Sequence, residues 1–407
     1  MKLNKWSAAL AGISAVSLAS TAHGDESHPV NTLLSATTLS GFVDTSASWQ
    51  LKSGGGVAQR FVNTGENRQD GFNLNLVKIQ LEKPVDEGTW SAGYNVETVF
   101  GPDAVALPGN LGAGNQVAFE QAYVALRAPV GNGIDIKVGL YNPVIGYEST
   151  DSYANPNFSR SFGFALQPRG HLGTLATYQV TESVGVSAGI ANTGNNGLFS
   201  KANGNNSIES NKSYLGAVTL KAPDSWGWLG GSSLYAGIVD AGHTSAAGPA
   251  STPQSSIYTG GNTINLYVGA SVSTPIKELS VGASYDYLFN GYGSTAVAGF
   301  KGSYANATAL YASYQLTKEI KLNNRVEYAT SSGLDSATSG GFNFLPNSLS
   351  PINDQKIFGE TFTLDYSLWA SVITRAEFRW DHDTANNHGL GGRNDDLSIT
   401  ANVIYKF

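Results

Sequence analysis

The stretch DDLSITANVIYKF, residues 395–407, alternates apolar and polar side chains. From residue 397 on, one parity is apolar throughout: Leu397, Ile399, Ala401, Val403, Tyr405 and Phe407. The other parity is polar apart from Ile404. A period of two over this length predicts a β-strand with one apolar and one polar face. Either a protein core or lipid must cover the apolar face.

The composition restricts the class of protein. The chain has 407 residues, of which 14% are charged, against about 25% in ordinary soluble domains. Its mean hydropathy of −0.14 does not fit a helical membrane protein, which needs apolar runs of about 20 residues. Cysteine is absent, which excludes disulfides and Cys-based metal sites. The formal charge of −7 argues against a nucleic-acid partner.

The N-terminus has the features of a secretory signal peptide. Lys2 and Lys5 form a basic segment, small uncharged residues follow, and cleavage is expected after Gly24, with Ala22 as the alternative. We therefore expect residues 1–24 to be a signal peptide and residues 25–38 a short periplasmic segment. Residues 39–407 are expected to form the folded domain.

The closing pattern recurs along the chain, as in TWSAGYNVETVFG (89–101) and GETFTLDYSLWA (359–370). The second parity is mostly Gly, Ser, Thr and Asn, which is typical of a water-filled barrel lumen. The side chains predicted to face lipid include Tyr94, Val96, Tyr285, Phe362, Leu364 and Val403. Those predicted to face water include Asn95, Glu97, Asp286, Thr363 and Asn402.

Sixteen segments have strand character, and short turns alternate with long polar loops between them. They span 39–50, 71–83, 89–100, 116–128, 133–142, 170–180, 183–192, 213–222, 231–240, 262–274, 278–290, 303–316, 319–330, 355–368, 371–382 and 395–407. Outer-membrane barrels have short periplasmic turns and long outer loops. The sequence therefore predicts an all-β fold: a closed antiparallel transmembrane β-barrel of about 16 strands in the outer membrane of a Gram-negative cell. A soluble secreted β-protein is the alternative.

The stretch AYVALRAPVGNGIDIKVGLYNPVIGYES (122–149) resembles the putative beta-barrel porin-2 (OmpL-like) family. The matching motifs are Ala122-Tyr123-Val124, Pro143 and Gly146-Tyr147-Glu148, whereas Gly139-Leu140-Tyr141 departs from the family's Gly-Lys-Phe-like tripeptide. The resemblance implies an outer-membrane porin and supplies no substrate.

Three function classes remain: a porin for passive diffusion of small hydrophilic solutes or ions, a structural or adhesive barrel with a blocked lumen, and an outer-membrane enzyme. We expect no enzyme and no cofactor, because the motifs for a nucleophile elbow, a phosphate loop or a zinc protease are absent. The acidic loop 381–396 fails the spacing of calcium loops, so no metal is expected. Expected partners are outer-membrane lipid, the barrel-assembly machinery, the solutes and, by analogy with porins of this size, two further copies in a homotrimer.

A constriction is expected where loop 143–169, with Glu148, Asp151 and Arg160, folds inward. The charged side chains on the inward parity of strands 319–330 and 371–382 are Lys321, Arg325, Glu327, Arg375, Glu377, Arg379 and Asp381. Our hypothesis sets the loop acids across the lumen from Arg325, Arg375 and Arg379, which would create a transverse field. The alternative is cross-strand pairing within the wall, since same-strand pairs such as Arg379 with Asp381 are not expected to form easily.

The closing aromatics Tyr405 and Phe407 resemble the C-terminal signal by which outer-membrane barrels are recognised for assembly. They are therefore candidate assembly residues.

Overall fold

Sixteen long strands form a closed barrel in the computed structural model, which describes residues 30–31, 37–51, 70–107, 109–110, 115–192, 212–243, 261–292, 303–332, 355–386, 390 and 393–407. The long strands are β2 (Thr38–Gln50), β3 (Gly71–Lys83), β4 (Ser91–Phe100), β6 (Val117–Ala128), β7 (Ile134–Tyr141), β8 (His171–Thr181), β9 (Val184–Asn192), β10 (Lys212–Lys221), β11 (Ser233–His243), β12 (Gly261–Ser273), β13 (Leu279–Tyr292), β14 (Ser303–Gln315), β15 (Ile320–Ser331), β16 (Gln355–Trp369), β17 (Val372–Asp383) and β18 (Asp395–Lys406). Two short strands, β1 (Val30–Asn31) and β5 (Gly109–Asn110), pair with β2 and β6.

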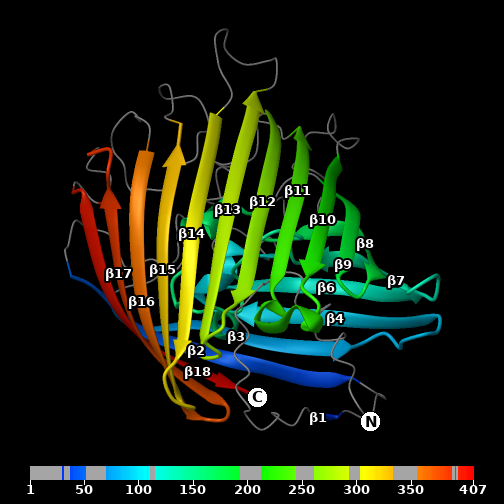
Figure 1. The fold of residues 1–407 in the computed structure, drawn as a ribbon, viewed down its shortest axis with the longest axis horizontal. Coiled ribbons are helices and arrows are strands. Elements are labelled where there is room, and N and C mark those ends of the chain that lie inside the picture. The colour runs from blue at the N-terminus through cyan, green and yellow to red at the C-terminus, as the bar shows by residue number, and fades with distance from the viewer. Residues whose placement is uncertain are drawn as a thin grey trace.

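Every pairing is antiparallel, and β18 closes the ring by pairing with β2. Figure 1 shows the upright strands β10–β15 in front of β2, β3, β4 and β6, which run across the view behind them. This crossing is expected, because tilted strands on opposite walls of a barrel point in different directions. Closure pairs the backbone groups of every strand and leaves no open edge.

The predicted fold class is confirmed, and the predicted strand boundaries lie within three residues of those in the structure. The segment predicted at 71–83 coincides with β3, whereas β11 extends to His243 instead of ending at 240. The predicted signal peptide, residues 1–24, lies outside the described residues and stays a prediction.

Side-chain exposure alternates along the strands as the pattern indicates. Phe362, Leu364 and Val403 are 51%, 42% and 46% exposed, whereas Thr363 and Asn402 are 3% and 1% exposed. Exposed apolar side chains on the outside of a closed barrel form the lipid-facing surface of an outer-membrane protein.

Ile404 is the one apolar residue on the polar parity of β18, and it points inward. It is fully buried and packs in a cluster with Phe42 and Leu76 inside the barrel. The exception in the alternation therefore marks a local apolar patch on the inner wall.

The connections differ between the two ends of the barrel. Seven short connections, from β3–β4 to β16–β17, lie at the end of the barrel where Figure 1 places the C-terminus. One of them, between β10 and β11, contains the 3₁₀-helix η4 (Asp224–Leu229). Among the described residues, no helix is both long and apolar enough to cross a bilayer.

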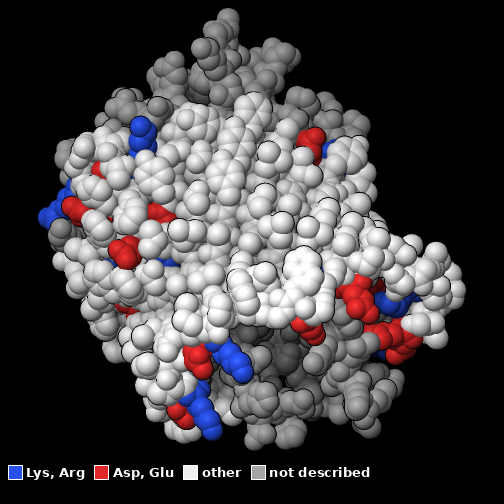
Figure 2. All heavy atoms as spheres, viewed as in Figure 1, with Lys and Arg blue, Asp and Glu red and all other residues white. Residues whose placement is uncertain are grey.

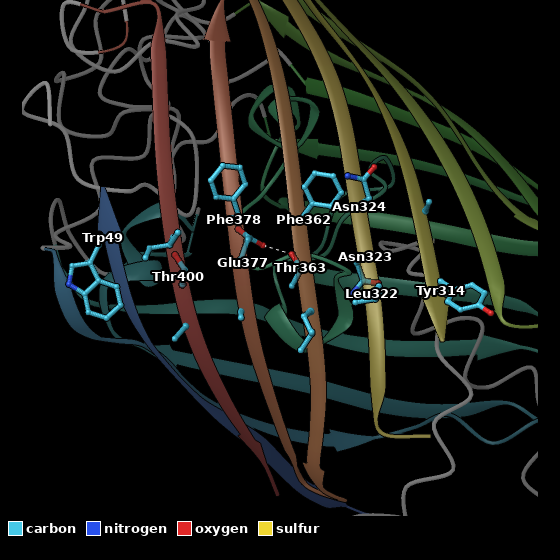
Figure 3. Close-up of a pocket in the computed structure, with 15 residues that line it drawn as sticks. Trp49, Tyr314, Leu322, Asn323, Asn324, Phe362, Thr363, Glu377, Phe378 and Thr400 are labelled. Carbon is cyan, nitrogen blue, oxygen red and sulfur yellow. Dashed lines mark hydrogen bonds between the residues drawn. The ribbon is translucent and has the colours of Figure 1, made fainter. Parts of the chain in front are cut away.

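The outer face carries little charge in its centre, over β12–β14 in Figure 2. A groove of about 630 Å³ crosses the outer face of β14–β18 beside Trp49. Ala376 and Ala401 pair at its floor, and Phe362 and Phe378 project beside them (Figure 3). This groove lies on the lipid side and is separate from the lumen.

Candidate channel constriction

The segment between β7 and β8, residues 142–170, folds into the barrel and is buried there. It contains the 3₁₀-helix η2 (Ser152–Ala154) and the helix α2 (Phe162–Leu166). Val144, Ile145 and Tyr147 are 1–2% exposed. We call this segment the inner loop. The predicted inward excursion of loop 143–169 is what the structure has.

Glycines on the inner wall make room for the apolar side chains of the inner loop. A Cβ atom at Gly237 would lie 2.6 Å from Cγ2 of Ile145, and one at Gly282 would overlap the hydroxyl of Tyr147. A Cβ atom at Gly359 would lie 3.1 Å from Cε2 of Phe162. The wall of β11, β13 and β16 is therefore shaped to receive the loop.

Aromatic packing holds the first turn of the inner loop. The rings of Tyr147 and Tyr311 stack with centroids 4.1 Å apart, and the hydroxyl of Tyr235 donates to the carbonyl of Val144. Burial raises the pKa of Tyr147 to about 12, so its hydroxyl stays protonated at neutral pH. This part of the interior is a buried apolar cluster, with Glu148 at its edge accepting from the hydroxyl of Tyr311.

Arginines of β15 and β17 bind the loop directly. Nη1 of Arg325 lies 2.9 Å from Oε1 of Glu148 and 2.7 Å from the carbonyl oxygen of Ser159. Arg375 donates to the carbonyl oxygens of Ser152 and Asn155 at 2.7 and 2.8 Å. Bidentate guanidinium contacts of this kind fix geometry as well as charge.

Acids on the same strands accept hydrogen bonds from the loop backbone. The amides of Phe158 and Ser159 donate to Glu377 at 2.5 and 3.0 Å, and the amide of Phe162 donates to Glu327 at 2.6 Å. These carboxylates satisfy N–H groups that would otherwise be buried without partners.

Arg160 is fully buried and donates hydrogen bonds to the backbone of its own loop. Its guanidinium donates to the carbonyl oxygens of Ser149, Phe158 and Thr150 at 2.9–3.0 Å. Its own carbonyl oxygen accepts from Arg379 at 2.8 Å. Arg160 therefore shapes the loop and does not face an open lumen.

The hypothesis of a field across the lumen is wrong in its geometry. Glu148 and Arg325 were expected on opposite sides of an opening, but they form a buried ion pair. Arg379 and Arg375 are 4–5% exposed and are likewise covered by the loop. The loop can lie against this side of the barrel because the wall glycines Gly237, Gly282 and Gly359 leave room for its side chains.

The expectation that charged residues two apart on one strand do not pair easily was also wrong. Nε of Arg379 lies 2.8 Å from Asp381, and Nε of Arg325 lies 3.0 Å from Glu327. Residues i and i+2 project from the same face of a strand, and the long arginine side chain spans the distance between them. The cross-strand alternative also occurs, since Arg375 lies 2.8 Å from its register partner Asp365. Lys321 is half-buried and also stands opposite Asp365 in the register.

The inner loop reaches the opposite wall through Lys78, which the sequence analysis missed. Nζ of Lys78 lies 2.8 Å from Asp151, 2.7 Å from Glu97 and 3.3 Å from Glu120. Thr150 donates to Glu120, and Ser152 donates to Asp44 on β2. The nearby Asp151 carboxylate raises the pKa of Tyr153 above its ordinary value.

Two β-bulges place part of this cluster. The register shifts opposite Asp44 and Thr45 leave Asn75 as an extra residue on β3, and a shift at Glu97 leaves Glu120 extra on β6. A bulge redirects a side chain that strict alternation would send outward. The sequence does show Lys78 as the basic residue on the inward parity of β3. The two bulges, in contrast, have no signature in the sequence from which they could be predicted.

A cavity of about 340 Å³ lies beside the inner loop on the β3–β8 side. Loop residues Ser149, Asp151 and Tyr153 form one side of it. The wall side includes Gln80, Glu82, Asn95, Glu97, Gln121, Tyr123, Arg127, Asp135, Lys137 and Thr177. The lining extends to Pro84 and Glu87 on the β3–β4 turn, so the cavity reaches the short-turn end of the barrel.

Tyr405 and Phe407 lie at the seam between β18 and β2. The backbone of Phe407 exchanges two hydrogen bonds with Gly41, at 2.9 and 3.0 Å, and its ring covers that glycine. The Tyr405 and Phe407 rings stack at 6.4 Å.

The fold is shared with solved outer-membrane proteins of low sequence identity. The anion-selective porin from Comamonas acidovorans is 12% identical, with a TM-score of 0.56 over 91% of this chain and 99% of that one. The outer membrane channel DcaP of Acinetobacter baumannii is 12% identical, with a TM-score of 0.55 over 91% and 97%. OmpT of Vibrio cholerae is 12% identical, with a TM-score of 0.53 over 93% and 100%. At such identities the likeness shows the fold alone.

No curated protein sequence matches the chain significantly. The family model of the putative beta-barrel porin-2, OmpL-like proteins matches residues 36–407, which covers the whole barrel. The resemblance noted at Ala122–Val124 and Gly146–Glu148 is therefore confirmed. The chain belongs to the putative beta-barrel porin-2, OmpL-like family and is a porin of the outer membrane.

Proposed function

We propose that small hydrophilic solutes and ions cross this porin by passive diffusion along its β3–β8 side. The observation that carries the proposal is the cavity between that wall and loop segment 149–154, whose lining includes charged and amide side chains. On the opposite side, the inner loop packs directly on β11–β17, with Phe162 and Leu166 in an apolar cluster. In this account the narrowest part of the channel is bounded by the loop and by β3, β4, β6 and β7.

The charges around this passage favour cations. Six carboxylates line or adjoin it, against four cationic groups: Glu82, Glu87, Glu97, Glu120, Asp135 and Asp151 against Lys78, Lys83, Arg127 and Lys137. A narrow wet passage with an excess of one sign attracts counter-ions. Arg325, Arg375 and Arg379 contribute little to this field, because each is paired under the loop.

Planar-bilayer recording of the purified protein tests both statements. We expect stepwise channel openings and a reversal potential in a salt gradient that indicates cation preference. Glu82→Gln should reduce the cation-to-anion permeability ratio by about twofold, the order expected for one solvated charge. Glu278→Gln makes the same chemical change on an exposed turn outside the cavity and should leave the ratio unchanged. Anion preference in the parent would contradict the proposed route.

A barrel with a blocked lumen is the second candidate, because the inner loop bonds to opposite walls. Asp151 binds Lys78 on β3, and the next residue, Ser152, binds Arg375 on β17 through its carbonyl oxygen. Folded protein that inserts into bilayers without conductance would favour this candidate. Either way, we propose that the protein acts as a barrel in the membrane and not as a catalyst.

We also propose a homotrimer. OmpT of Vibrio cholerae has been solved in a trimer form. The outer groove over β14–β18, floored by Ala376 and Ala401, would let a second barrel approach closely. Cross-linking in the native membrane should give a trimer, and Ala401→Trp should reduce it. A monomer at all cross-linker concentrations would contradict the proposal.

Assembly is proposed to depend on Phe407 through the barrel-assembly machinery. Because Phe407 also seals the β18–β2 seam at Gly41, Phe407→Ser should lower the amount of heat-modifiable protein in the outer membrane while export continues. Lys277→Ser, on an exposed turn, is the matched control. Parent-like levels of the Phe407 variant would remove its role as an assembly signal.

A further inference from the structure

In the part of the chain that the structure describes, two charged groups on the inward parity of the cavity wall are not in ion pairs, unlike the others there. Lys83 and Glu87 also line the cavity, from the other parity of β3 and from the β3–β4 turn. Arg127 binds both carboxylate oxygens of Asp135 at 2.8 Å. Glu97 and Asp151 bind Lys78. Glu82 and Lys137 also line the cavity, but among the described residues neither has an ion-pair partner within 4.0 Å. Both are partly exposed to the cavity.

Weak contacts hold these two groups in place. Nζ of Lys137 lies 4.7 Å from the ring centroid of Tyr123, a cation–π geometry. Nε2 of Gln80 lies 3.5 Å from Oε2 of Glu82, at the limit of a hydrogen bond. Neither contact removes the charge from the solvent in the cavity.

The two charges stand on opposite flanks of the concave wall. Glu82 is on β3 and Lys137 is on β7, with β4 and β6 between them. In the register, Glu82 stands opposite Asn95, and Asn95 opposite Tyr123. The charges are close enough to interact, but they do not meet. A negative and a positive group thus face the same water-filled space from two sides.

We propose that this cavity is a binding subsite for small zwitterionic solutes, with the solute's ammonium group at Glu82 and its carboxylate at Lys137. The proposal rests on the proposed diffusion route through the same cavity. At this one pair of charges a simple cation or anion gains at one flank what it loses at the other, so the pair adds nothing to the cation preference of the whole passage, and a neutral solute gains at neither flank. A solute with both charges gains at both flanks. The volume of about 340 Å³ is within the roughly 300–1,000 Å³ of small-molecule sites.

The test measures solute flux into proteoliposomes with four probes of similar size: glycine, glycolamide, glycolate and ethanolamine. Through the parent protein, glycine should cross about two- to fivefold faster than glycolamide, the range expected from solvated charge contacts. Glu82→Gln and Lys137→Gln should each bring the glycine-to-glycolamide ratio close to one. The double exchange Glu82→Lys with Lys137→Glu should restore part of the preference, because the dipole is reversed but kept.

Exposed residues of the β12–β13 turn provide the matched control. Lys277→Gln and Glu278→Gln make the same chemical changes at the same end of the barrel, outside the cavity, and should leave the ratio at the parent value. Equal flux of glycine and glycolamide through the parent, with normal conductance, would overturn the zwitterion subsite and leave the diffusion route standing. A parent that passes none of the four probes and carries no current would overturn both.

Discussion

The inner loop meets two walls of different character. On the β10–β17 side, apolar side chains lie over glycines, and the strand arginines are paired with carboxylates: Arg325 with Glu148 and Glu327, Arg375 with Asp365, and Arg379 with Asp381 and Glu327. On the β2–β6 side, Lys78 alone is shared by three carboxylates next to a cavity. The wall of paired charges and apolar contacts can hold the loop in place, and the acidic wall beside the cavity can form the channel. We therefore propose that the anchoring and conducting surfaces of this porin lie on opposite sides of one loop.

Arg325→Met removes the guanidinium that binds the inner loop at Glu148 and Ser159. The substitution leaves Glu148 and Glu327 buried without their shared cation, and losing one partner of a buried pair costs about 3–5 kcal/mol. Urea unfolding in lipid vesicles, followed by tryptophan fluorescence, should show this loss. Arg393→Met, at an exposed position, is the control and should stay within about 0.5 kcal/mol of the parent. An Arg325 variant as stable as the control would mean that the arginine does not anchor the loop.

Gly282→Val fills the space that Gly282 leaves for the side chain of Tyr147. The new side chain would occupy the space of the tyrosine ring, and overpacking of this kind costs about 1–3 kcal/mol. The displaced loop should widen the passage, so single-channel conductance should rise. Gly216→Val is matched to it, because a Cβ atom there meets only Cγ2 of Ile238 at an ordinary 3.5 Å. If both variants conduct like the parent, the seated loop does not set the conductance.

Asp151→Asn removes one of the three carboxylates around Lys78, and we expect it to have the smallest effect of the three variants. Lys78 keeps Glu97 and Glu120 as partners, and the repulsion among the three carboxylates falls. The two effects oppose each other, so the unfolding free energy should change by no more than about 0.5 kcal/mol. A loss comparable to that of Arg325→Met would show that the β3 contact anchors the loop as firmly as the arginines do.

Much of the barrel could be predicted from the sequence, because a strand's period of two is local. The alternation around Phe362 and Asn402 and the spacing of turns and loops were enough for sixteen strands and closure. The inward course of the inner loop was also predicted, from its length and its charges. These features depend on residues that are near each other in the chain.

The arrangement around the loop could not be predicted, because it depends on contacts between distant segments. The role of Gly237 and Gly282 in making room for the loop can be recognised only when Ile145 and Tyr147 are placed against them. The bulge that turns Glu120 inward has no local signal. The sequence therefore indicated which arginines matter, but placed them across a lumen instead of under the loop.

We propose that the open path runs along the β3–β8 wall and that the inner loop covers the β15–β17 wall. Because the chain has no cysteine, single cysteines can be placed and labelled with a water-soluble thiol reagent. Gln80→Cys and Thr177→Cys line the cavity, whereas Thr361→Cys and Thr363→Cys lie under the loop at 0% and 3% exposure. We expect rapid labelling and a fall in conductance for the first pair, and neither for the second. Equal labelling of both pairs, or labelling of the second pair alone, would contradict this proposal.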